Sequence, residues 1–168
     1  MDIKQANLAD LDELYQIETK IWHSDAATKD SLTTRIKLFP EGFLVAKINN
    51  KIAGFVNSAR IGDIKVGKFS DLVPFERVFK KNGPIFYIYS LQVDKAYRGK
   101  GISHKLIDSL VEIARDLGCR KIWLVGSDEN TSIGFATTPV YERWGFKIKK
   151  CLPNYLEGKP GSLMEIVL

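Results

Sequence analysis

Glycines alternate with basic residues in the stretch Arg98-Gly99-Lys100-Gly101, directly before an amphipathic run that begins at Ile102. A helix that starts there carries a partial positive charge at its N-terminus and leaves its first backbone N–H groups unpaired. Glycine has no Cβ atom and readily adopts positive φ angles, so successive N–H groups can converge on the oxygen atoms of an anion. The residue types and their spacing therefore predict a cradle for a phosphate or diphosphate group.

Two nucleotide-binding motifs that use glycine-rich turns do not match this stretch. The P-loop places its glycines further apart than Gly99 and Gly101 and continues with Lys and then Ser or Thr, which are absent here. The dinucleotide fingerprint GxGxxG would put its third glycine at position 104, which is His104. Kinases and nucleotide-binding Rossmann domains are therefore disfavoured. A plain turn that only joins a strand to a helix stays as the alternative.

The turn resembles motif A of the GCN5-related N-acetyltransferase (GNAT) superfamily, written Q/R-x-x-G-x-G/A. Residues 98–103 match this motif except at Ser103, where the family has Gly or Ala, and the upstream stretch YSLQVDKAYRGKGIS is similar to the family's strand and turn. Further along, PVYERWGFK (139–147) is similar to the family's motif B, with Tyr141, Gly145 and Phe146 in register. The stretch RIKLFPEGFLVAKINNKIAGFVNS is also similar to bacterial arylalkylamine-type relatives, which favours aromatic amines.

The resemblance implies that acetyl-CoA is the co-substrate and that no metal takes part. The pyrophosphate would lie on the turn 98–103, and the pantetheine arm would bind backbone groups at the end of the preceding strand. The cofactor-binding residues implied in this way are Leu91, Gln92, Val93, Arg98, Gly99, Lys100, Gly101, Ile102, Ser103 and Tyr141.

Acetyl transfer to an amine needs a neutral amine, a polarised thioester carbonyl and a proton for the departing thiolate. A phenol with a pKa of about 10 can protonate a thiolate whose conjugate acid has a pKa of about 8.5. The tyrosine of motif B often has this role in the family, and Tyr141 occupies its position. The alternative is a core tyrosine that packs against a strand.

The sequence does not identify the general base, which many relatives carry as a glutamate or histidine on the strand that matches 85–93. Alternation separates the side chains of this strand into two sets, Tyr87, Tyr89 and Leu91 on one face and Ile88, Ser90 and Gln92 on the other. The positions that hold histidines in arylalkylamine-type relatives are tyrosines here. A chain of water molecules that ends on Tyr87, Tyr89 or Glu41 is one hypothesis, with Tyr89 as the catalytic candidate. A packing or surface role for these residues is the favoured alternative.

Residues for the acceptor are expected in IWHSDAA, which lies where relatives bind the amine. His23 and Asp25 are the candidates there, since a carboxylate attracts an ammonium group, and Tyr87 is a third. Ordinary loop roles are the alternative for His23 and Asp25. Motif B also tends to carry an asparagine seven residues before its tyrosine, but that position is Gly134, and Asn130 is the nearest asparagine.

The elements that position these residues follow from periodicity and turn residues. A strand is expected over 85–93, a helix over 102–117 and a strand over 121–126, which together form a parallel strand–helix–strand unit. The other expected elements are a strand at 1–6, helices from a cap at Asn7 to about residue 21 and over 28–38, a hairpin at 42–61, an irregular segment at 62–84, a helix over 138–143, and strands at 146–150 and 163–168.

These elements predict one mixed α/β domain. The GNAT resemblance implies a mostly antiparallel seven-stranded sheet with a central parallel unit and helices on both faces. A single N-acetyltransferase domain is therefore expected over residues 1–168.

Composition narrows the class of protein further. Of 168 residues, 45% are apolar and 27% are charged, which is typical of an ordinary globular chain. The net charge of +5 comes from scattered residues, so nucleic acid is disfavoured as a partner. No signal peptide and no membrane span are expected, and Cys119 and Cys151 form no disulfide framework, so the expected location is the cytoplasm. Both cysteines are expected to be unreactive thiols.

The leading hypothesis is an acetyl-CoA-dependent N-acetyltransferase that acts on a primary amine by direct attack in a ternary complex. The partner would be a small-molecule amine or a peptide N-terminus, and a homodimer through a strand edge is a further expectation. The alternatives are a protein or peptide Nα-acetyltransferase and a non-catalytic acyl-CoA-binding regulatory module.

Overall fold

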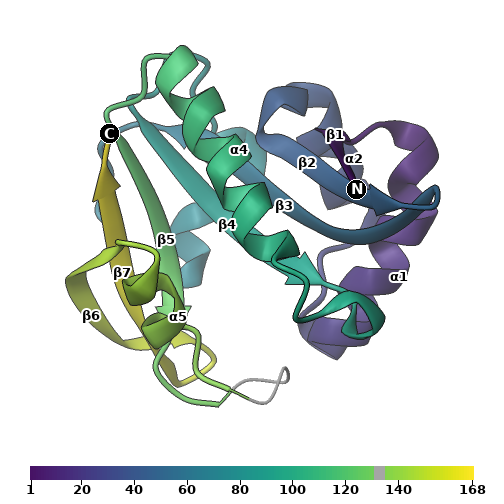
Figure 1. The fold of residues 1–168 in the computed structure, drawn as a ribbon. Coiled ribbons are helices and arrows are strands. Elements are labelled where there is room, and N and C mark those ends of the chain that lie inside the picture. Colours follow the sequence, from purple (N-terminus) through teal and green to yellow (C-terminus); the bar gives the residue numbers. More distant parts are fainter. Residues whose placement is uncertain (131–134) are drawn as a thin grey trace. The chain divides into compact units, whose positions relative to one another are not determined.

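A computed structural model describes residues 1–130 and 135–168. The strands form a seven-stranded mixed sheet in the order β1-β2-β3-β4-β5-β7-β6, mostly antiparallel, with β4 and β5 parallel (Figure 1). This confirms the expected fold class and the parallel strand–helix–strand unit. The chain divides into two compact units, residues 1–59 with 89–117 (unit 1) and residues 60–88 with 118–168 (unit 2). Strands β3 and β4 contribute to both units.

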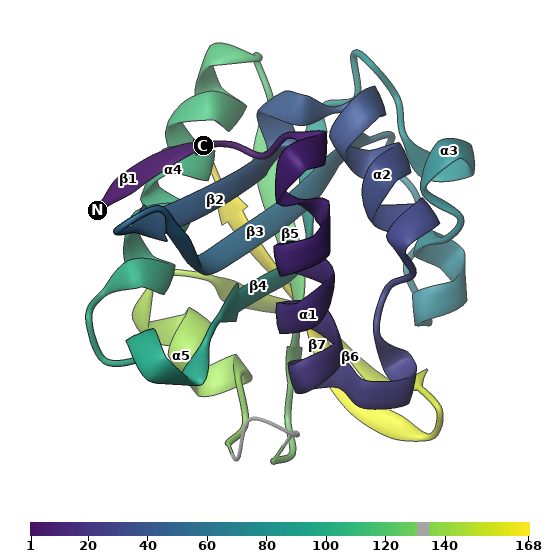
Figure 2. The ribbon, with the colours of Figure 1, turned by 90° about the vertical axis from the view of Figure 1, so that its right-hand side faces the viewer.

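Unit 1 holds the first strands and the three longest helices. Its strands are β1 (Asp2–Gln5), β2 (Phe43–Ile48), most of β3 (Lys51–Ile61) and the second half of β4 (Ile85–Val93). Its helices are η1 (Leu8–Asp10), α1 (Leu11–Trp22), η2 (His23–Asp25), α2 (Lys29–Leu38), η3 (Pro40–Gly42), η5 (Lys95–Tyr97) and α4 (Ile102–Asp116). Helices α1 and α2 lie on one face of the strands of this unit, and α4 lies on the other (Figure 2).

Local side-chain bonds explain where the helices of unit 1 begin. The Asn7 side chain accepts a hydrogen bond from the Ala9 N–H at 2.9 Å, and the Asp10 carboxylate accepts one from the Asn7 N–H at 3.1 Å. This reciprocal capping box confirms the start expected at Asn7. Thr28 caps α2 in the same way, because its hydroxyl accepts the Ser31 N–H at 3.1 Å.

Unit 2 is built around β5 and the C-terminal hairpin. Its elements are η4 (Phe69–Leu72), α3 (Phe75–Val78), the first half of β4, β5 (Lys121–Ser127), α5 (Thr138–Arg143), β6 (Lys147–Leu156) and β7 (Lys159–Val167). The parallel ladder joins Ile85–Tyr87 of β4 to residues 121–123 of β5. On its other side β5 pairs with β7 along its whole length, so residues 121–123 of β5 have a neighbouring strand on both sides.

The last two strands differ from the expectation in length and in pattern. Both β6 and β7 are longer than the strands expected at 146–150 and 163–168, because they form one continuous hairpin. The lysines of β6 do not alternate with buried residues, because the register shifts between Ile148 and Lys150, and Ile148 itself is 45% exposed. A strand at the end of a sheet has no neighbour on one side, and its lysines discourage pairing with another chain.

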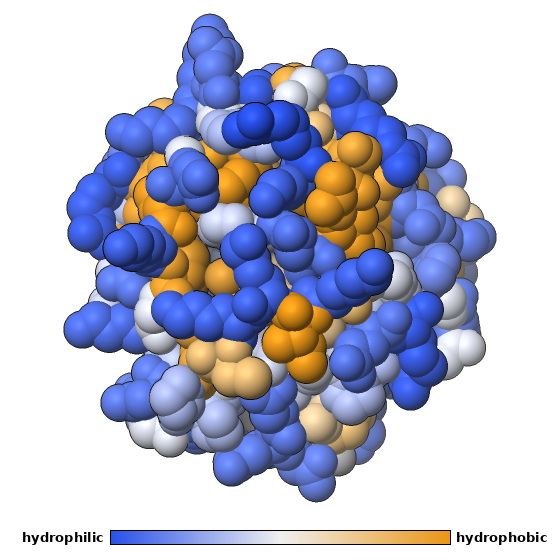
Figure 3. All heavy atoms as spheres, turned by 90° about the vertical axis from the view of Figure 1, so that its left-hand side faces the viewer, coloured by the Kyte–Doolittle hydropathy of each residue, from blue (hydrophilic) through white to orange (hydrophobic). Residues whose placement is uncertain are grey.

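The surface drawn in Figure 3 carries hydrophobic side chains in separate groups, with hydrophilic side chains between them. Apolar atoms make up much of the surface of any folded protein, so these groups by themselves identify no function.

Gly54 generates a prediction about the packing of unit 1. A Cβ atom at this position would lie 2.6 Å from the Gln92 carbonyl oxygen and 3.3 Å from Cγ2 of Ile102. We expect Gly54→Ala to destabilise the fold by about 1–3 kcal/mol through overpacking, seen as a lower Tm. The control is Gly62→Ala, whose added Cβ would meet nothing within 4 Å. Equal Tm values for the two variants would contradict the close approach of β3, β4 and α4.

Candidate active site

The glycine turn before α4 has the geometry expected of an anion cradle. Gly99 and Gly101 have φ angles of 75° and 72°, and Gly101 is the N-cap residue of α4. A Cβ atom at either glycine would meet nothing within 4 Å, so the requirement for glycine is conformational and the space beside the backbone is open. No side chain caps the helix, while Ile102 is buried and holds its first turn in the core. The N-terminal N–H groups of α4 can therefore receive an anion.

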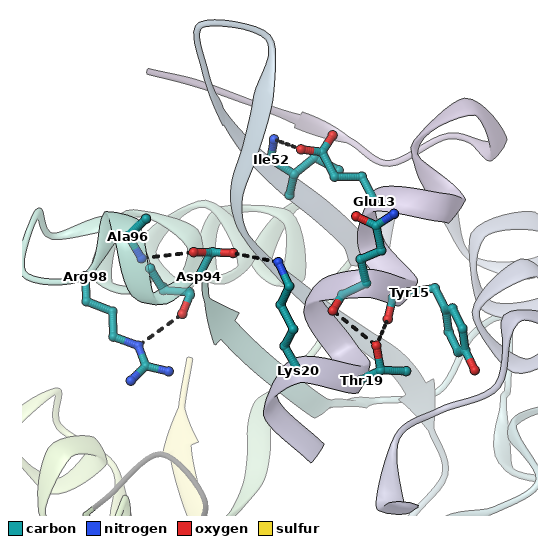
Figure 4. Close-up of polar contacts among 10 residues, drawn as sticks. Glu13, Tyr15, Thr19, Lys20, Ile52, Asp94, Ala96 and Arg98 are labelled. Carbon is teal, nitrogen blue, oxygen red and sulfur yellow. Dashed lines mark hydrogen bonds and ion pairs between the residues drawn. The ribbon is translucent and has the colours of Figure 1, made fainter. Parts of the chain in front are cut away.

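Polar contacts hold the turn against the end of β4 and against α1 (Figure 4). The Asp94 carboxylate accepts a hydrogen bond from the Ala96 N–H at 2.9 Å, and its other oxygen lies 4.0 Å from the Lys20 ammonium. The Arg98 Nε donates to the Val93 carbonyl at 3.2 Å. Residues 98–101 are exposed, so Arg98 and Lys100 place positive charge beside the open helix terminus.

The end of β4 combines two partly accessible residues with one buried polar residue. Leu91 and Val93 are partly accessible, whereas Gln92 is only 3% exposed. The ladder with β5 ends at Tyr87, and β4 continues from there to Val93. The backbone at Leu91–Val93 was expected to bind the pantetheine arm, and the structure places these residues immediately before the turn.

A buried carboxylate lies beside Gln92, and it was not among the residues expected at the site. Glu18 of α1 is 4% exposed. Its Oε1 accepts the Ala27 N–H at 3.0 Å, and its Oε2 accepts a hydrogen bond from the Gln92 side-chain amide. Burial raises the pKa of Glu18, while the bonds from Ala27 and Gln92 and the positive charge of Arg35 act in the opposite direction. On balance, the buried site stabilises the protonated form of the Glu18 carboxyl more than water would.

Arg35 of α2 connects this cluster to the centre of β4. Its guanidinium donates to the Asn57 side-chain oxygen at 2.8 Å, and the Asn57 amide donates to the Ser90 hydroxyl at 2.5 Å. The same guanidinium lies 4.8 Å from the centre of the Tyr89 ring, at cation–π distance. Tyr89, the expected catalytic residue of this strand, is therefore held through its ring by Arg35.

Strict alternation along β4 is wrong at its C-terminal half. It was expected to put Tyr89 and Gln92 on opposite faces, yet Tyr89 contacts Arg35 of α2 and Gln92 bonds Glu18 of α1. Both helices lie on the same face of unit 1 (Figure 2). Such a break in the period of two is what a local bulge produces in a strand.

Glu18 and Arg35 could have been found from the apolar stripes of their helices. The buried face of α1 consists of Leu14, Ile17, Glu18 and Ile21, and that of α2 consists of Leu32, Arg35 and Ile36. A charged residue inside a helical apolar stripe is unusual, because an ion loses its hydration when it is buried. That pattern marks both positions in the sequence, although it does not reveal their partners.

Tyr141 occupies a packed position in unit 2. Its ring meets the rings of Trp144 and Phe146 edge-on, at centroid distances of 5.7 and 6.0 Å. Burial of the phenol raises the pKa of Tyr141 to about 12, although the residue as a whole keeps some exposure. Gly145, with a φ of 89°, ends α5 and lets the Phe146 N–H donate to the Tyr141 carbonyl at 3.1 Å. The tyrosine and the glycine of motif B thus shape one turn.

The remaining candidates lie in different environments. Tyr87 is buried in unit 2, and its hydroxyl oxygen lies 3.0 Å from that of Tyr155. His23 and Asp25 are exposed in η2, and Glu41 is exposed in η3. Neither His23 nor Asp25 belongs to the buried cluster, but η2 follows directly on the helix that carries Glu18.

Other expectations concern the loop after β5, the cysteines and metal ions. Position 134 lies outside the described residues, while Asn130 is exposed. Burial raises the pKa of the Cys119 thiol, which fits an unreactive cysteine. Within residues 1–130 and 135–168 there is no group of three or more His, Cys, Asp or Glu side chains that could hold a metal ion. No helix in that part of the chain is long and apolar enough to cross a membrane.

Comparison with known proteins agrees with this arrangement. The sequence model of the acetyltransferase (GNAT) family matches residues 9–146. A glucosamine 6-phosphate N-acetyltransferase from Trypanosoma brucei brucei is 38% identical over 61 residues, which cover 36% of this chain and 37% of that relative. The chain thus spans little more than a third of that curated relative.

Solved structures share the fold at low sequence identity. A GNAT-like decarboxylase, GphF, in complex with isobutyryl-CoA has a TM-score of 0.81 at 18% identity, over 99% of both chains. Naa50 from Arabidopsis thaliana, in complex with the bisubstrate analogue CoA-Ac-MVNAL, has a TM-score of 0.70 at 18% identity, over 99% of this chain and 98% of the other. Because the family model covers most of its length, this chain belongs to the acetyltransferase (GNAT) family of enzymes.

Proposed function

We propose that this enzyme transfers the acetyl group of acetyl-CoA to a primary amine, by direct attack of the amine in a ternary complex, and that residues 1–168 act as one catalytic domain. The observation that carries the proposal is the open, uncapped N-terminus of α4 behind two glycines with positive φ. That geometry suits a diphosphate, and Arg98 and Lys100 supply the matching charge. The structures of GphF and Naa50 contain CoA species, which supports the same ligand class here.

Two backbone segments would hold acetyl-CoA. The pyrophosphate would accept hydrogen bonds from the N–H groups of residues 99–103, and the pantetheine amides would pair with the backbone of Leu91–Val93. Backbone beyond the end of the β5 ladder suits this purpose, because an extended amide chain binds a strand edge as another strand does. Tyr141 would contact the region of the sulfur atom.

Tyr141 is the proposed acid. Because burial raises its pKa to about 12, the phenol keeps its proton throughout the physiological pH range. It can therefore donate a hydrogen bond to the sulfur as negative charge develops there and pass on a proton as the C–S bond breaks. Tyr89 remains a second candidate, as a group that contacts the reacting atoms from β4, and Tyr87, His23 and Asp25 remain candidates for contact with the acceptor.

The acceptor belongs to one of three amine classes. The relative from Trypanosoma brucei brucei favours an amino sugar phosphate, Naa50 favours a peptide N-terminus, and the similarity to arylalkylamine-type relatives favours an aromatic amine. A homodimer and a cytoplasmic location are further proposals, the latter supported by two free cysteines. The alternative is a module that binds acyl-CoA without catalysis. A lack of turnover with amines of all three classes would favour it.

Thermal melts with acetyl-CoA, CoA and ATP test the cradle. Ligand at about a hundred times its Kd stabilises the folded state by roughly 2.7 kcal/mol, which for a chain of this size is on the order of 5–10 °C in Tm. We expect this rise with both CoA species and not with ATP. No rise with either CoA species would leave the turn as a plain connection and remove the basis of the proposal.

Gly101→Ala and Gly158→Ala refine this test. Both glycines have positive φ angles of 72° and 81° and open space beside them, so alanine costs each about 1–2 kcal/mol. Only Gly101 lies at the cradle. We expect Gly101→Ala to weaken CoA binding by at least about tenfold, or 1.4 kcal/mol, and Gly158→Ala to keep the full rise in Tm. Equal responses would contradict an anion site at α4.

Tyr141→Phe tests the acid. Removal of the phenolic proton donor is expected to lower kcat by on the order of 10²-fold, with little change in the Tm rise caused by CoA. Tyr15→Phe is the control, because Tyr15 is a half-buried tyrosine of α1 whose ring lies 5.5 Å from the Lys29 ammonium. A Tyr141→Phe enzyme with the kcat of the Tyr15→Phe enzyme would exclude Tyr141 as the acid.

A further inference from the structure

Gln92 carries a buried acceptor atom that lacks a donor. Its Oε1 has no hydrogen-bond partner among residues 1–130 and 135–168, although the residue is 3% exposed. Its Nε2 is used, because it donates to Glu18. Buried polar atoms are nearly always paired, so such an orphan indicates a missing donor from a water molecule or a ligand.

Glu18 adds further acceptor capacity at the same place. Each oxygen of a carboxylate can accept two hydrogen bonds, yet those of Glu18 accept one each, from the Ala27 N–H and from Gln92. Both donors are neutral, and the positive charge of Arg35 acts on Glu18 without a hydrogen bond between the two side chains. The buried Asp10 differs, because its carboxylate lies 2.5 Å from the Lys47 ammonium and also accepts the Asn7 N–H. The fold therefore pairs Asp10 with a cation of its own and leaves acceptor capacity at Glu18 and Gln92.

The surroundings of the pair favour an amine as the missing donor. A primary ammonium group carries several N–H donors and one positive charge, which matches one carboxylate and one amide oxygen. The Ala27 N–H that bonds Glu18 follows η2, where Asp25 is exposed and can attract a cation from solvent. On the chain, Gln92 lies two residues before Asp94, whose side chain anchors the turn of the cradle (Figure 4).

We propose that Glu18 and Gln92 form the subsite that binds the acceptor amine, with Gln92 Oε1 accepting one N–H of the amine and Glu18 removing its first proton. This inference rests on the proposed function. The ammonium group gives one proton to the Glu18 carboxylate, and the nitrogen lone pair forms the bond to the thioester carbonyl carbon. The C–S bond breaks and its electron pair goes to sulfur, which takes the phenolic proton of Tyr141. The second proton lost by the nitrogen restores that phenol. Glu18 then releases its proton to solvent.

A purely structural role is the competing explanation, in which Glu18 only ties the segment after η2 to β4. Glu18→Gln separates the two. Glutamine can still accept the Ala27 N–H, and its Nε2 can donate to Gln92 Oε1 once the Gln92 amide turns over, so both hydrogen bonds survive. The charge and the basicity are lost, and Gln92 Oε1 is then used inside the pair and no longer faces the amine.

Stability gives the first readout. A carboxyl pKa raised by folding means that this group contributes most stability below its unfolded pKa of about 4.3 and loses that contribution as the pH rises through its folded pKa. Arg35 of α2 is the charged group that acts on Glu18 and opposes this effect. We expect Glu18→Gln to have a Tm equal to or above that of the wild type at pH 8. A Tm several degrees lower would show a structural tie and overturn the proposal.

Kinetics give the second readout, with the amine of the three classes that is turned over fastest. We expect Glu18→Gln to lower kcat/KM for the amine by on the order of 10²-fold, and Gln92→Met to raise the KM for the amine by about tenfold, while the Tm rise with CoA is kept in both. Glu13→Gln is the matched control, because Glu13 also lies on α1 and accepts a strand N–H, that of Ile52 at 2.9 Å (Figure 4). Activity of Glu18→Gln equal to that of Glu13→Gln would overturn the proposal.

A binding measurement decides the subsite even if no amine is turned over. The side-chain amide resonances of Gln92 are identified in NMR spectra by their loss in Gln92→Met. We expect methylamine, added to the CoA complex, to shift these resonances in the wild type. If methylamine shifts these resonances but no amine is turned over, catalysis is rejected and the amine site is kept. If an amine is turned over but methylamine shifts no Gln92 resonance, the proposed function is kept and this subsite is rejected. A buried water molecule would then be the partner of Gln92.

Discussion

The N-terminus of α4 has to stay open to a ligand while the helix itself stays fixed, and much of unit 1 follows from this requirement. The buried face of α4 is apolar, with Ile102, Leu106 and Leu110 in the core, so the helix is held from its first turn onward. Gly54 permits β3 to approach that first turn closely. The chain before the helix is held by Asp94 and Arg98 instead of by a side-chain cap. The unpaired N–H groups are thus left for an anion.

Strand β4 serves two purposes along its length. Its first half is buried and apolar apart from Tyr87, and residues 85–87 pair with β5, which builds the sheet. Its second half carries Tyr89, Ser90 and Gln92, each of which contacts a polar or charged side chain that comes from α1, α2 or β3. The change from packing to polar contacts occurs where the alternation of the strand fails, and it turns Gln92 toward α1.

The fold could be predicted from the sequence wherever neighbouring residues determine it. The cap at Asn7, the hairpin at 42–61 and the bounds of α5 depend on residues a few positions apart, and all agree with the structure. The anion cradle belongs to the same class, because the spacing of two glycines encodes it. The pairing of Glu18 with Gln92 joins residues 74 positions apart, and no local pattern encodes such a contact. The period of β4 failed for the same reason, since tertiary contacts set the direction of its side chains.

This difference explains why the sequence reveals the class of the co-substrate sooner than the acceptor. A diphosphate is bound largely by backbone N–H groups and by exposed cations, and such a site depends on local conformation more than on particular side chains. An amine has to be bound and deprotonated by side chains that are positioned from separate elements. In the subsite proposed for the amine, Glu18 and Gln92 are buried, and burial of a charge such as that of Glu18 opposes folding. For the base proposed there, this cost to stability has a use, because the loss of hydration that raises the pKa of the carboxyl also makes the carboxylate a stronger base.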